Sequence, residues 1–280
     1  MTYTCGNQTV PVSQKTETAT SQYLEQVRSY YDTMNPHYLK YVGKTYQAGL
    51  LVTSDTDSAR ASNLYFASQA GIKPGDRVLD AGCGVCGPSI DIAQNIEDLK
   101  IDAITLSPVQ ANTARELVQQ ADLANRIQVH IGDFHSLPFA NRTFDIVFFF
   151  ESTGYCCDRQ QLFTEVYRVL RPGGTIYIKD VFSNELPLSE QQQQELAEFD
   201  RVYVYKTPRI SETREAISAA GFHEIESRDL GEVVSTKDFV KAMFQYKYGF
   251  PLLSDFGQAH YRNFQSLPIY FGQIKASKRG

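Results

Sequence analysis

The chain has no tryptophan, only three methionines among its 280 residues, and no apolar run near the length of about 18 residues that a membrane helix needs. Its first 21 residues are polar and rich in threonine, without the basic start and apolar stretch of a secretory signal. These absences predict a protein without a membrane span. We expect residues 1–21 to be a flexible leader and the protein to be cytoplasmic.

An excess of positive charge is also missing. Lysine and arginine number 27 against 32 acidic residues, which gives a formal net charge of −5. Proteins that bind nucleic acids present a basic face to the phosphates. We therefore do not expect nucleic acid as the main partner, and a small-molecule substrate is the expected one.

The five cysteines are an odd number and lack the spacing of a disulfide framework. Cys83 and Cys86 form a C-x-x-C pair, and Cys156 and Cys157 are adjacent. Neither a second spaced pair nor a suitable spacing of the five histidines accompanies them, so we predict no metal site. We interpret Cys83 and Cys86 as small residues of a tight turn, and leave a redox role open.

One stretch organises the chain. An apolar run ends at Asp80, and Gly82, Gly84 and Gly87 follow before a helix begins near Ser89. This is the pattern strand, tight turn, helix. Glycine allows positive φ and a close approach of the backbone to a ligand. The free N–H groups at the start of a helix add partial positive charge. The stretch therefore predicts a nucleotide-like cofactor at the carboxyl end of a parallel strand.

Strands alternate with helices from 76 to 182, which predicts a doubly wound, mostly parallel sheet. Hydrophobic periodicity and turn residues predict helices at 22–34 (ended by Asn35-Pro36), 57–71, 90–96, 107–121, 160–170, within 184–209, 212–220 and 237–248, and strands ending at Asp80 and at 101–106, 127–131, 144–150, 175–180, 223–228 and 269–276. We divide the chain into the leader, a helical and aromatic cap at 22–72, and a main domain at 73–280 with lid insertions at 184–209 and 235–262.

Further motifs narrow the family. The turn 80–87 is joined by Gly132-Asp133 after the third strand, 144–147 at the start of the fourth, and Arg171-Pro172-Gly173-Gly174 before the fifth. This set resembles the class I S-adenosylmethionine-dependent methyltransferases over about residues 70–182. The resemblance implies a Rossmann-like α/β fold with seven strands, S-adenosylmethionine as the cofactor, and methyl transfer as the activity.

The resemblance also implies roles for individual residues. Asp80, Gly82, Cys83 and Gly84 would lie under the methionine end of the cofactor, Asp133 would hydrogen-bond the adenine amine, and Phe134 would lie beside the ring. The family's usual acid at the end of the second strand is replaced by Thr105. The segment from Ile104 through Leu106 to Gln110 resembles the methyltransferases of sterols, prenyl diphosphates and cyclopropane fatty acids, in which Thr and Gln meet the ribose.

Two flanking segments resemble the same group. Residues 30–32 and 43–46 resemble its aromatic N-terminal segment, and 151–155 its acidic active-site loop. Methyl addition to an alkene carbon creates a carbocation, which aromatic faces and a carboxylate stabilise. We predict that Glu151, Tyr31, Tyr46 and Tyr155 are catalytic, with Glu151 also accepting the proton and with Tyr31 and Glu151 also touching the cofactor. Tyr30 and Tyr203 are further candidate faces.

Three functions remain open. The leading one is C-methylation of a terpenoid or prenyl-type alkene in specialised metabolism. The alternative is N- or O-methylation of a small metabolite, for which His135 is a candidate base. The third is a cofactor-binding regulatory protein without an activity of its own. A diphosphate acceptor would need clustered cations, and those at 201–247 are not spaced diagnostically. The acceptor, the methylated atom and homo-oligomerisation stay open.

Overall fold

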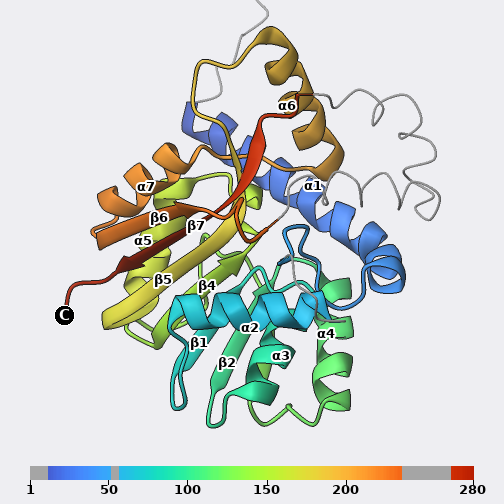
Figure 1. Cartoon of the computed structure of the whole chain (residues 1–280), viewed down its shortest axis with the longest axis vertical. Helices are drawn as coiled ribbons and strands as arrows, with labels where there is room; N and C mark the ends of the chain where they lie inside the picture. Colours follow the sequence, from blue (N-terminus) through green and yellow to red (C-terminus); the bar gives the residue numbers. More distant parts are fainter. Residues whose placement is uncertain (1–11, 52–56, 235–265) are drawn as a thin grey trace, which may run out of the picture.

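The computed structural model describes residues 12–51, 57–234 and 266–280, with side chains from residue 20 onward. At its centre is a seven-stranded sheet in the order β3-β2-β1-β4-β5-β7-β6 (Figure 1). All neighbouring strands are parallel except β7, which runs antiparallel to both β5 and β6. The expected doubly wound, mostly parallel seven-stranded fold is confirmed.

The central strands are apolar on both sides because helices cover both faces of the sheet. In β4, Phe148 faces one core cluster and Phe149 the other, and both are fully buried. The strands are β1 (Arg77–Ala81), β2 (Lys100–Thr105), β3 (Ile127–Ile131), β4 (Phe144–Phe150), β5 (Leu170–Ser183), β6 (His223–Asp229) and β7 (Ile269–Ser277). Strand β5 begins before the expected 175–180, so 171–174 lie inside it as an irregular start.

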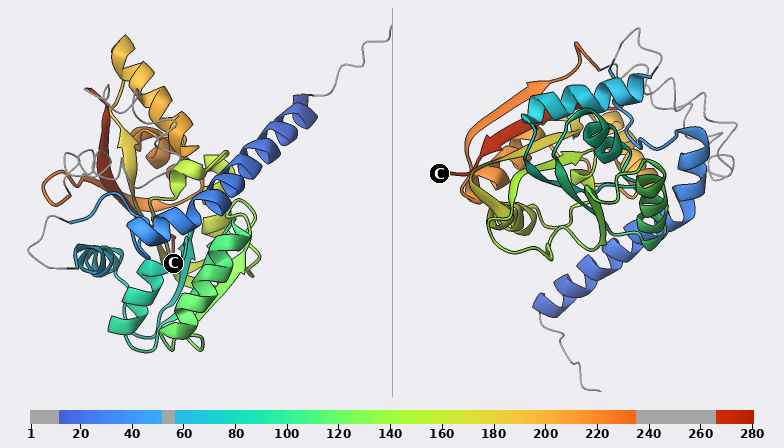
Figure 2. Two further views of the ribbon diagram at one scale, coloured as in Figure 1. Left: turned by 90° about the vertical axis from the view of Figure 1, so that its right-hand side faces the viewer. Right: turned by 90° about the horizontal axis from the view of Figure 1, so that it is seen from below.

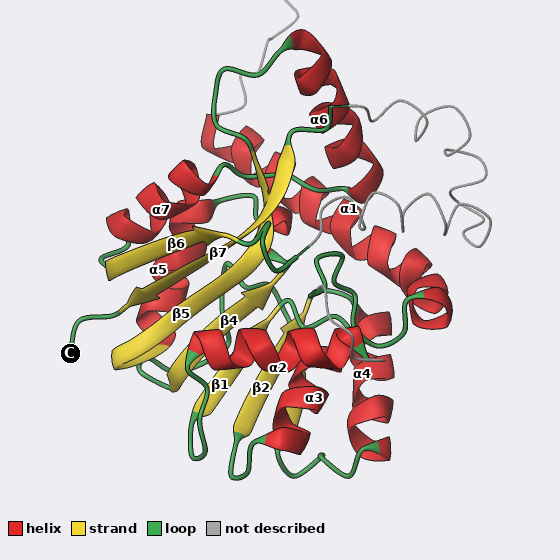
Figure 3. Ribbon diagram, viewed as in Figure 1, coloured by secondary structure: helices red, strands yellow, loops and turns green. Residues whose placement is uncertain are grey.

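Helices α2, α3 and α4 pack on one face of the sheet, and α5 and α7 on the other (Figures 1 and 3). Ser107 caps α4 as predicted, its side chain accepting the N–H of Gln110, and Gly71 ends α2 in the left-handed conformation. The helices are α1 (Val12–Tyr41), α2 (Ser58–Ala70), α3 (Gly87–Asn95), α4 (Pro108–Gln120), the 3-10 turn η1 (Thr153–Tyr155), α5 (Arg159–Val169), α6 (Glu190–Tyr203) and α7 (Ile210–Ala219).

Helix α1 corrects two expectations. It begins at Val12, so the described part of the expected leader is helical, and it passes through Asn35-Pro36 to Tyr41. Pro36 has no N–H to offer the preceding turn, which normally breaks or kinks a helix. Tertiary contacts outweigh this, because Asn35 is buried and donates to Thr113 of α4 at 3.0 Å. Figure 2 shows the C-terminal end of α1 turned away from the rest of the helix.

Helices α1 and α6 lie on the side of the sheet where the parallel strands have their carboxyl ends (Figure 1). Residues 184–209, which we expected to form a lid, fold as α6 with its flanking loops. The second expected lid, 235–262, and the helix at 237–248 fall outside the described residues. No helix of the described ranges has the length and apolar character needed to cross a bilayer.

Candidate active site

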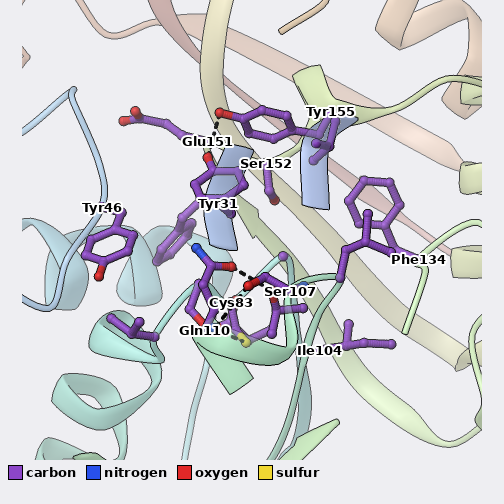
Figure 4. A pocket seen from close by; sticks show the side chains of 18 of the residues that line it. Tyr31, Tyr46, Cys83, Ile104, Ser107, Gln110, Phe134, Glu151, Ser152 and Tyr155 are labelled. Atoms are coloured by element: carbon purple, nitrogen blue, oxygen red, sulfur yellow. Dashed lines mark hydrogen bonds between the residues drawn. The ribbon is translucent and has the colours of Figure 1, made fainter. Parts of the chain in front are cut away.

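A cavity of about 870 Å³, open to solvent, lies at the carboxyl ends of β1, β2 and β4 beneath α1 (Figure 4). Its walls do not include Tyr30, His135 or Tyr203, but they include thirteen other residues that the sequence analysis proposed: Tyr31, Tyr46, Asp80, Gly82, Cys83, Gly84, Thr105, Leu106, Gln110, Asp133, Phe134, Glu151 and Tyr155. Residues from six separate stretches of chain thus meet in one cavity, at the position where open α/β sheets bind ligands.

The glycines of the turn after β1 serve two purposes. Gly82 has φ +87°, and a Cβ there would lie 2.4 Å from Ser152 Cβ. At Gly87 a Cβ would lie 2.0 Å from the backbone oxygen of Lys44. Gly84 alone has room at its Cα, in a left-handed conformation with φ +53°. Because Gly82 and Gly87 have no side chains, Ser152 and the backbone of Lys44 can pack directly against the turn. At Gly84 the bare backbone forms part of the cavity floor.

Cys86 occupies a glycine-like position. It is the N-cap of α3 in the left-handed conformation, with φ 64°, and it is fully buried. A non-glycine residue seldom adopts this conformation, which explains why glycine suits the position. Cys83 is also buried, and burial raises the pKa of its thiol well above the usual value. The Cys83 thiol therefore stays protonated, and the burial of both side chains agrees with their interpretation as small turn residues.

Asp80, one residue before the end of β1, lies on the cavity floor with an exposure of only 2%. Its Oδ2 accepts a hydrogen bond from Ser89 of α3 at 2.6 Å. Burial raises the pKa of Asp80 to about 7, and the bond from Ser89 opposes this only in part. Because this pKa lies near neutral pH, the carboxyl is only partly ionised, and a cationic partner beside it would favour the ionised form.

Thr105 and Gln110 form one unit. Thr105 Oγ1 donates to Gln110 Oε1 at 2.7 Å, so the side-chain NH₂ of Gln110 is the end left to face the cavity (Figure 4). Ser107, two residues after Thr105, donates to Asp32 of α1 at 2.5 Å. This contact, which sequence reasoning missed, ties α1 to the start of α4 and closes the cavity from above.

Asp133 and Phe134 line the cavity beyond β3, while His135 does not. His135 is buried beside Cys156 and Cys157, and its Nε2 accepts the backbone N–H of Cys157 at 3.2 Å. Its other nitrogen, Nδ1, therefore carries the proton that goes to Asp133 Oδ1, 2.6 Å away. His135 orients Asp133 from behind, and this contradicts its expectation as a base beside the acceptor.

Tyrosines form the wall of the cavity next to α1, which we call the roof. Tyr31 of α1 donates to the hydroxyl of Tyr155 at 2.6 Å, and the two rings meet edge to face with centroids 5.2 Å apart. Tyr46 donates to Asn35 Oδ1 at 3.0 Å. Burial raises the pKa of Tyr31 and Tyr155 well above the usual value, so both remain neutral donors. Tyr30 lies outside this cavity and contributes to a second one described below.

Glu151 follows β4 with φ +58°, a strained conformation for glutamate, and its side chain is only 8% exposed. Its Oε2 accepts the N–H of Ala48 at 2.7 Å, and its Oε1 accepts the N–H of Gly49 at 2.9 Å. Oε1 also accepts from Lys179 Nζ of β5 in an ion pair. Glu151 thus lines the cavity and at the same time anchors the segment that follows α1.

Lys179 is the residue that sequence reasoning should have noticed. It is fully buried, donates to Gln47 Oε1 at 3.1 Å, and lies over the rings of Phe66 and Phe271 at 5.2 and 5.3 Å. Burial lowers the pKa of Lys179, and the charge of Glu151 opposes this shift. A lysine inside an otherwise apolar strand is the sequence signal of such a buried pair.

Asp180, the next residue, faces the opposite side and is also fully buried. It accepts the N–H and hydroxyl of Thr153 at 2.8 and 2.6 Å, and the hydroxyl of Tyr205. Burial raises the pKa of Asp180 to about 6, while its hydrogen bonds oppose the rise. The ring of Tyr205 stands edge to face against Tyr155, 4.8 Å away, so Asp180 holds the tyrosine roof through Tyr205.

One polar atom at the cavity wall is without a partner. Arg28 Nε is buried and makes no hydrogen bond, although the guanidinium also pairs with Glu25 at 2.5 Å. Lys44, on the same wall, pairs with Asp91 at 2.6 Å. Among the described residues no group of three or more potential ligands is placed to hold a metal ion.

The chain is similar to known proteins over this region. Residues 78–174 match the family model described as a methyltransferase domain. Over 215 residues the chain is 27% identical to the sterol 24-C-methyltransferase of Kluyveromyces lactis, a match that covers 75% of this chain and 58% of the relative. The chain therefore spans little more than half the length of that relative.

Two solved structures share the fold. The [4+2]-cyclase SpnF superimposes with a TM-score of 0.75 at 21% identity, covering 91% of this chain and 95% of SpnF. A geranyl diphosphate methyltransferase, solved with geranyl diphosphate and sinefungin, also gives 0.75 at 19% identity, covering 91% and 99%. These likenesses concern the fold, because one fold hosts different reactions. Together with the seven-stranded sheet and the glycine turn, the match over residues 78–174 identifies a methyltransferase domain in this chain.

Proposed function

We propose that the protein transfers the methyl group of S-adenosylmethionine to an alkene carbon of an apolar terpenoid or prenyl-type acceptor. The observation that carries this proposal is the composition of one cavity. A floor with acidic and amide groups suited to the cofactor faces a roof of neutral tyrosines, Tyr31 and Tyr155 among them. The sterol and geranyl diphosphate methyltransferases that the chain resembles support an acceptor of this class.

The residues present fit the cofactor. Gly84 brings the bare backbone to the cavity wall, the NH₂ of Gln110 is directed by Thr105, and Asp133 is oriented by His135. Asp80, close to neutrality in the buried floor, would be ionised by the positive charges of the methionine end. When bound, S-adenosylmethionine supplies an electrophilic methyl group on a sulfonium. The chain supplies alignment and the exclusion of water.

The roof suits an acceptor that becomes positively charged. As the alkene carbon takes the methyl group, the neighbouring carbon becomes a cation, which the faces of aromatic rings attract. The hydroxyls of Tyr31 and Tyr155 stay protonated and so cannot quench that cation as phenolates. Arg28 and Lys44 on the wall are both paired with carboxylates, which limits repulsion of the cation.

Glu151 completes the proposed site. Three donors occupy its two oxygens, and a carboxylate has about four lone-pair positions. The remaining position on Oε2 is the proposed acceptor for the proton that leaves the cation. The same three donors fix the carboxylate in place, so that its charge is held beside the roof throughout the reaction.

The test is incubation of the protein with S-adenosylmethionine labelled at the methyl carbon and a panel of terpenoid alkenes, with the product analysed by NMR. The proposal expects a new carbon–carbon bond. A label found only on oxygen or nitrogen supports the alternative of N- or O-methylation. Absence of any methylated product together with measurable binding of S-adenosylhomocysteine supports a regulatory binding protein.

Glu151→Gln is not by itself a clean test of the proton acceptor, because it also breaks the pair with Lys179. A matched comparison uses Lys179→Met, which disturbs the same pair from a position outside the cavity wall. If Glu151 accepts the proton, Glu151→Gln loses at least a hundredfold more turnover than Lys179→Met. Equal losses would assign Glu151 a purely anchoring role.

A further inference from the structure

A second hollow lies on the other side of α1. This α1–α6 groove has a volume of about 1470 Å³, is widely open to solvent, and is bounded by α1, α6 and the loop after α6. Its walls are Tyr23, Glu25, Gln26, Ser29, Tyr30, Thr33, Met34, Ala197, Asp200, Arg201, Val204, Tyr205 and Lys206. The groove therefore has one wall from each of these two helices, which Figure 1 labels.

Helix α1 separates the groove from the cofactor cavity. Leu24, Val27 and Tyr31 line the cavity, and Tyr23 and Tyr30 line the groove. These two sets recur at helical spacing on different faces of the same helix. Along this stretch one helix therefore contributes side chains to both spaces.

Tyrosine rings close the remaining gap. Tyr30 and Tyr205 belong to the groove wall, and Tyr31 and Tyr155 to the cavity wall. Ring centroids are 5.2 Å apart for Tyr30–Tyr31 and 4.8 Å apart for Tyr155–Tyr205. Each ring of the cavity wall thus stands directly against a ring of the groove wall. The hydrogen bond of 2.6 Å between the Tyr31 and Tyr155 hydroxyls joins the two sides of this partition.

The charged groups around the groove are largely occupied. Arg201 pairs with Glu198 at 2.6 Å, and the carboxylate of Asp200 accepts from Thr207 at 2.5 Å. The ammonium of Lys206 lies over the ring of Tyr23, 3.8 Å from its centre. What these pairings leave facing the groove is mainly aromatic and aliphatic surface, which favours an uncharged ligand.

We propose that the α1–α6 groove binds the hydrocarbon body of the acceptor, and that Tyr31 and Tyr155 form the gate through which its reacting alkene reaches the cofactor cavity. This inference rests on the proposed function for the identity of the ligand. The ligand class is an extended, uncharged isoprenoid chain. Between Tyr23 and Met34 the groove follows α1 for about 16 Å, at 1.5 Å per residue. Opening the gate breaks the hydrogen bond between the Tyr31 and Tyr155 hydroxyls and separates their edge-to-face rings.

Photoaffinity labelling tests the groove without knowledge of the natural acceptor. The probe is a farnesol analogue that carries a diazirine, applied to the full chain in the presence of S-adenosylhomocysteine. We expect saturable labelling of peptides from 23–34 and 197–206, competed by unlabelled farnesol. Labelling confined to 80–85, or labelling that farnesol does not compete, would overturn the proposal.

Three variants sharpen the result. Ser29→Trp and Ala197→Trp fill the groove from exposed positions on α1 and α6, and Gln22→Trp adds the same bulk to an exposed position of α1 outside the groove. The two groove variants should reduce labelling at least tenfold, and the control should not. The dissociation constant of S-adenosylhomocysteine, measured by calorimetry, should stay unchanged in all three.

The outcomes separate this inference from the proposed reaction. If the protein methylates an alkene, and Ser29→Trp and Ala197→Trp leave that activity unchanged, the groove proposal is refuted and the proposed reaction stands. Competed labelling of the groove without transfer to any alkene refutes the proposed reaction and supports the groove as an isoprenoid site. Unchanged labelling in both groove variants refutes the groove whatever the activity.

Discussion

The buried pair of Glu151 and Lys179 makes the sharpest prediction. Its two side chains are 8% and 0% exposed, and each has further partners. Lys179→Met keeps most of the side-chain volume and leaves the Glu151 carboxylate buried with only the N–H groups of Ala48 and Gly49. Removing one partner of a buried pair typically costs about 3–5 kcal/mol, because the other charge remains without compensation.

The reverse change should cost less. In Glu151→Gln, Lys179 keeps Gln47 Oε1 as an acceptor and the faces of Phe66 and Phe271. Burial already lowers the pKa of Lys179, so the amine can lose its proton when the carboxylate is gone. We expect Glu151→Gln to lower the free energy of unfolding by about 1–3 kcal/mol, because a buried polar group is again left without its partner.

A double-mutant cycle measures the coupling. Urea unfolding, followed by far-UV circular dichroism, gives the free energy of unfolding for the wild type, both single variants and the double variant. The double variant should lose at least about 2 kcal/mol less than the sum of the singles, since each change removes the group that the other leaves unmatched. Additivity within about 0.5 kcal/mol would refute the pair as a coupled element.

A surface pair provides the matched control. Arg201 and Glu198 lie one helical turn apart on α6, with side-chain exposures of 50% and 25%. Exposed pairs contribute about 1 kcal/mol or less, because water screens them. The cycle of Arg201→Met and Glu198→Gln should therefore give a much smaller coupling energy than the buried pair under the same conditions.

Three further predictions address pH, cofactor affinity and packing. Burial raises the folded-state pKa of Asp180 from 3.8 to about 6. Its contribution to the free energy of unfolding, about 3 kcal/mol, is therefore present below about pH 4 and lost as the pH rises through about 6. In urea unfolding experiments, Asp180→Asn should show a flatter pH dependence over this window than the wild type, and equal slopes would contradict this. Thr105→Val frees the amide of Gln110 to rotate and should weaken binding of S-adenosylhomocysteine about fivefold by calorimetry, with unchanged affinity as the contrary result. Gly87→Ala would place a Cβ 2.0 Å from the backbone oxygen of Lys44 and should destabilise the fold by about 1–3 kcal/mol, whereas a thermal midpoint equal to that of the wild type would mean that this segment moves freely.

Much of the fold could be predicted from local pattern. Continuous apolar strands, glycine ends of helices and the Ser107-Pro108 cap depend on residues close together in the sequence, and the structure confirms them. The error at α1 has the opposite cause. Asn35-Pro36 is a local break signal, but contacts with residues far along the chain, such as Thr113, hold the helix together.

The sequence by itself determined the order of the elements, the glycine turn and which residues would meet in one cavity, because the carboxyl ends of parallel strands necessarily share one edge of the sheet. Only the tertiary structure decided what those residues contact. Glu151 is bound by Lys179 from β5 and by the segment after α1, His135 faces away from the cavity, and α1 divides the cavity from the groove. Such pairings join residues about thirty to more than a hundred positions apart, and side-chain packing rather than local pattern selects them.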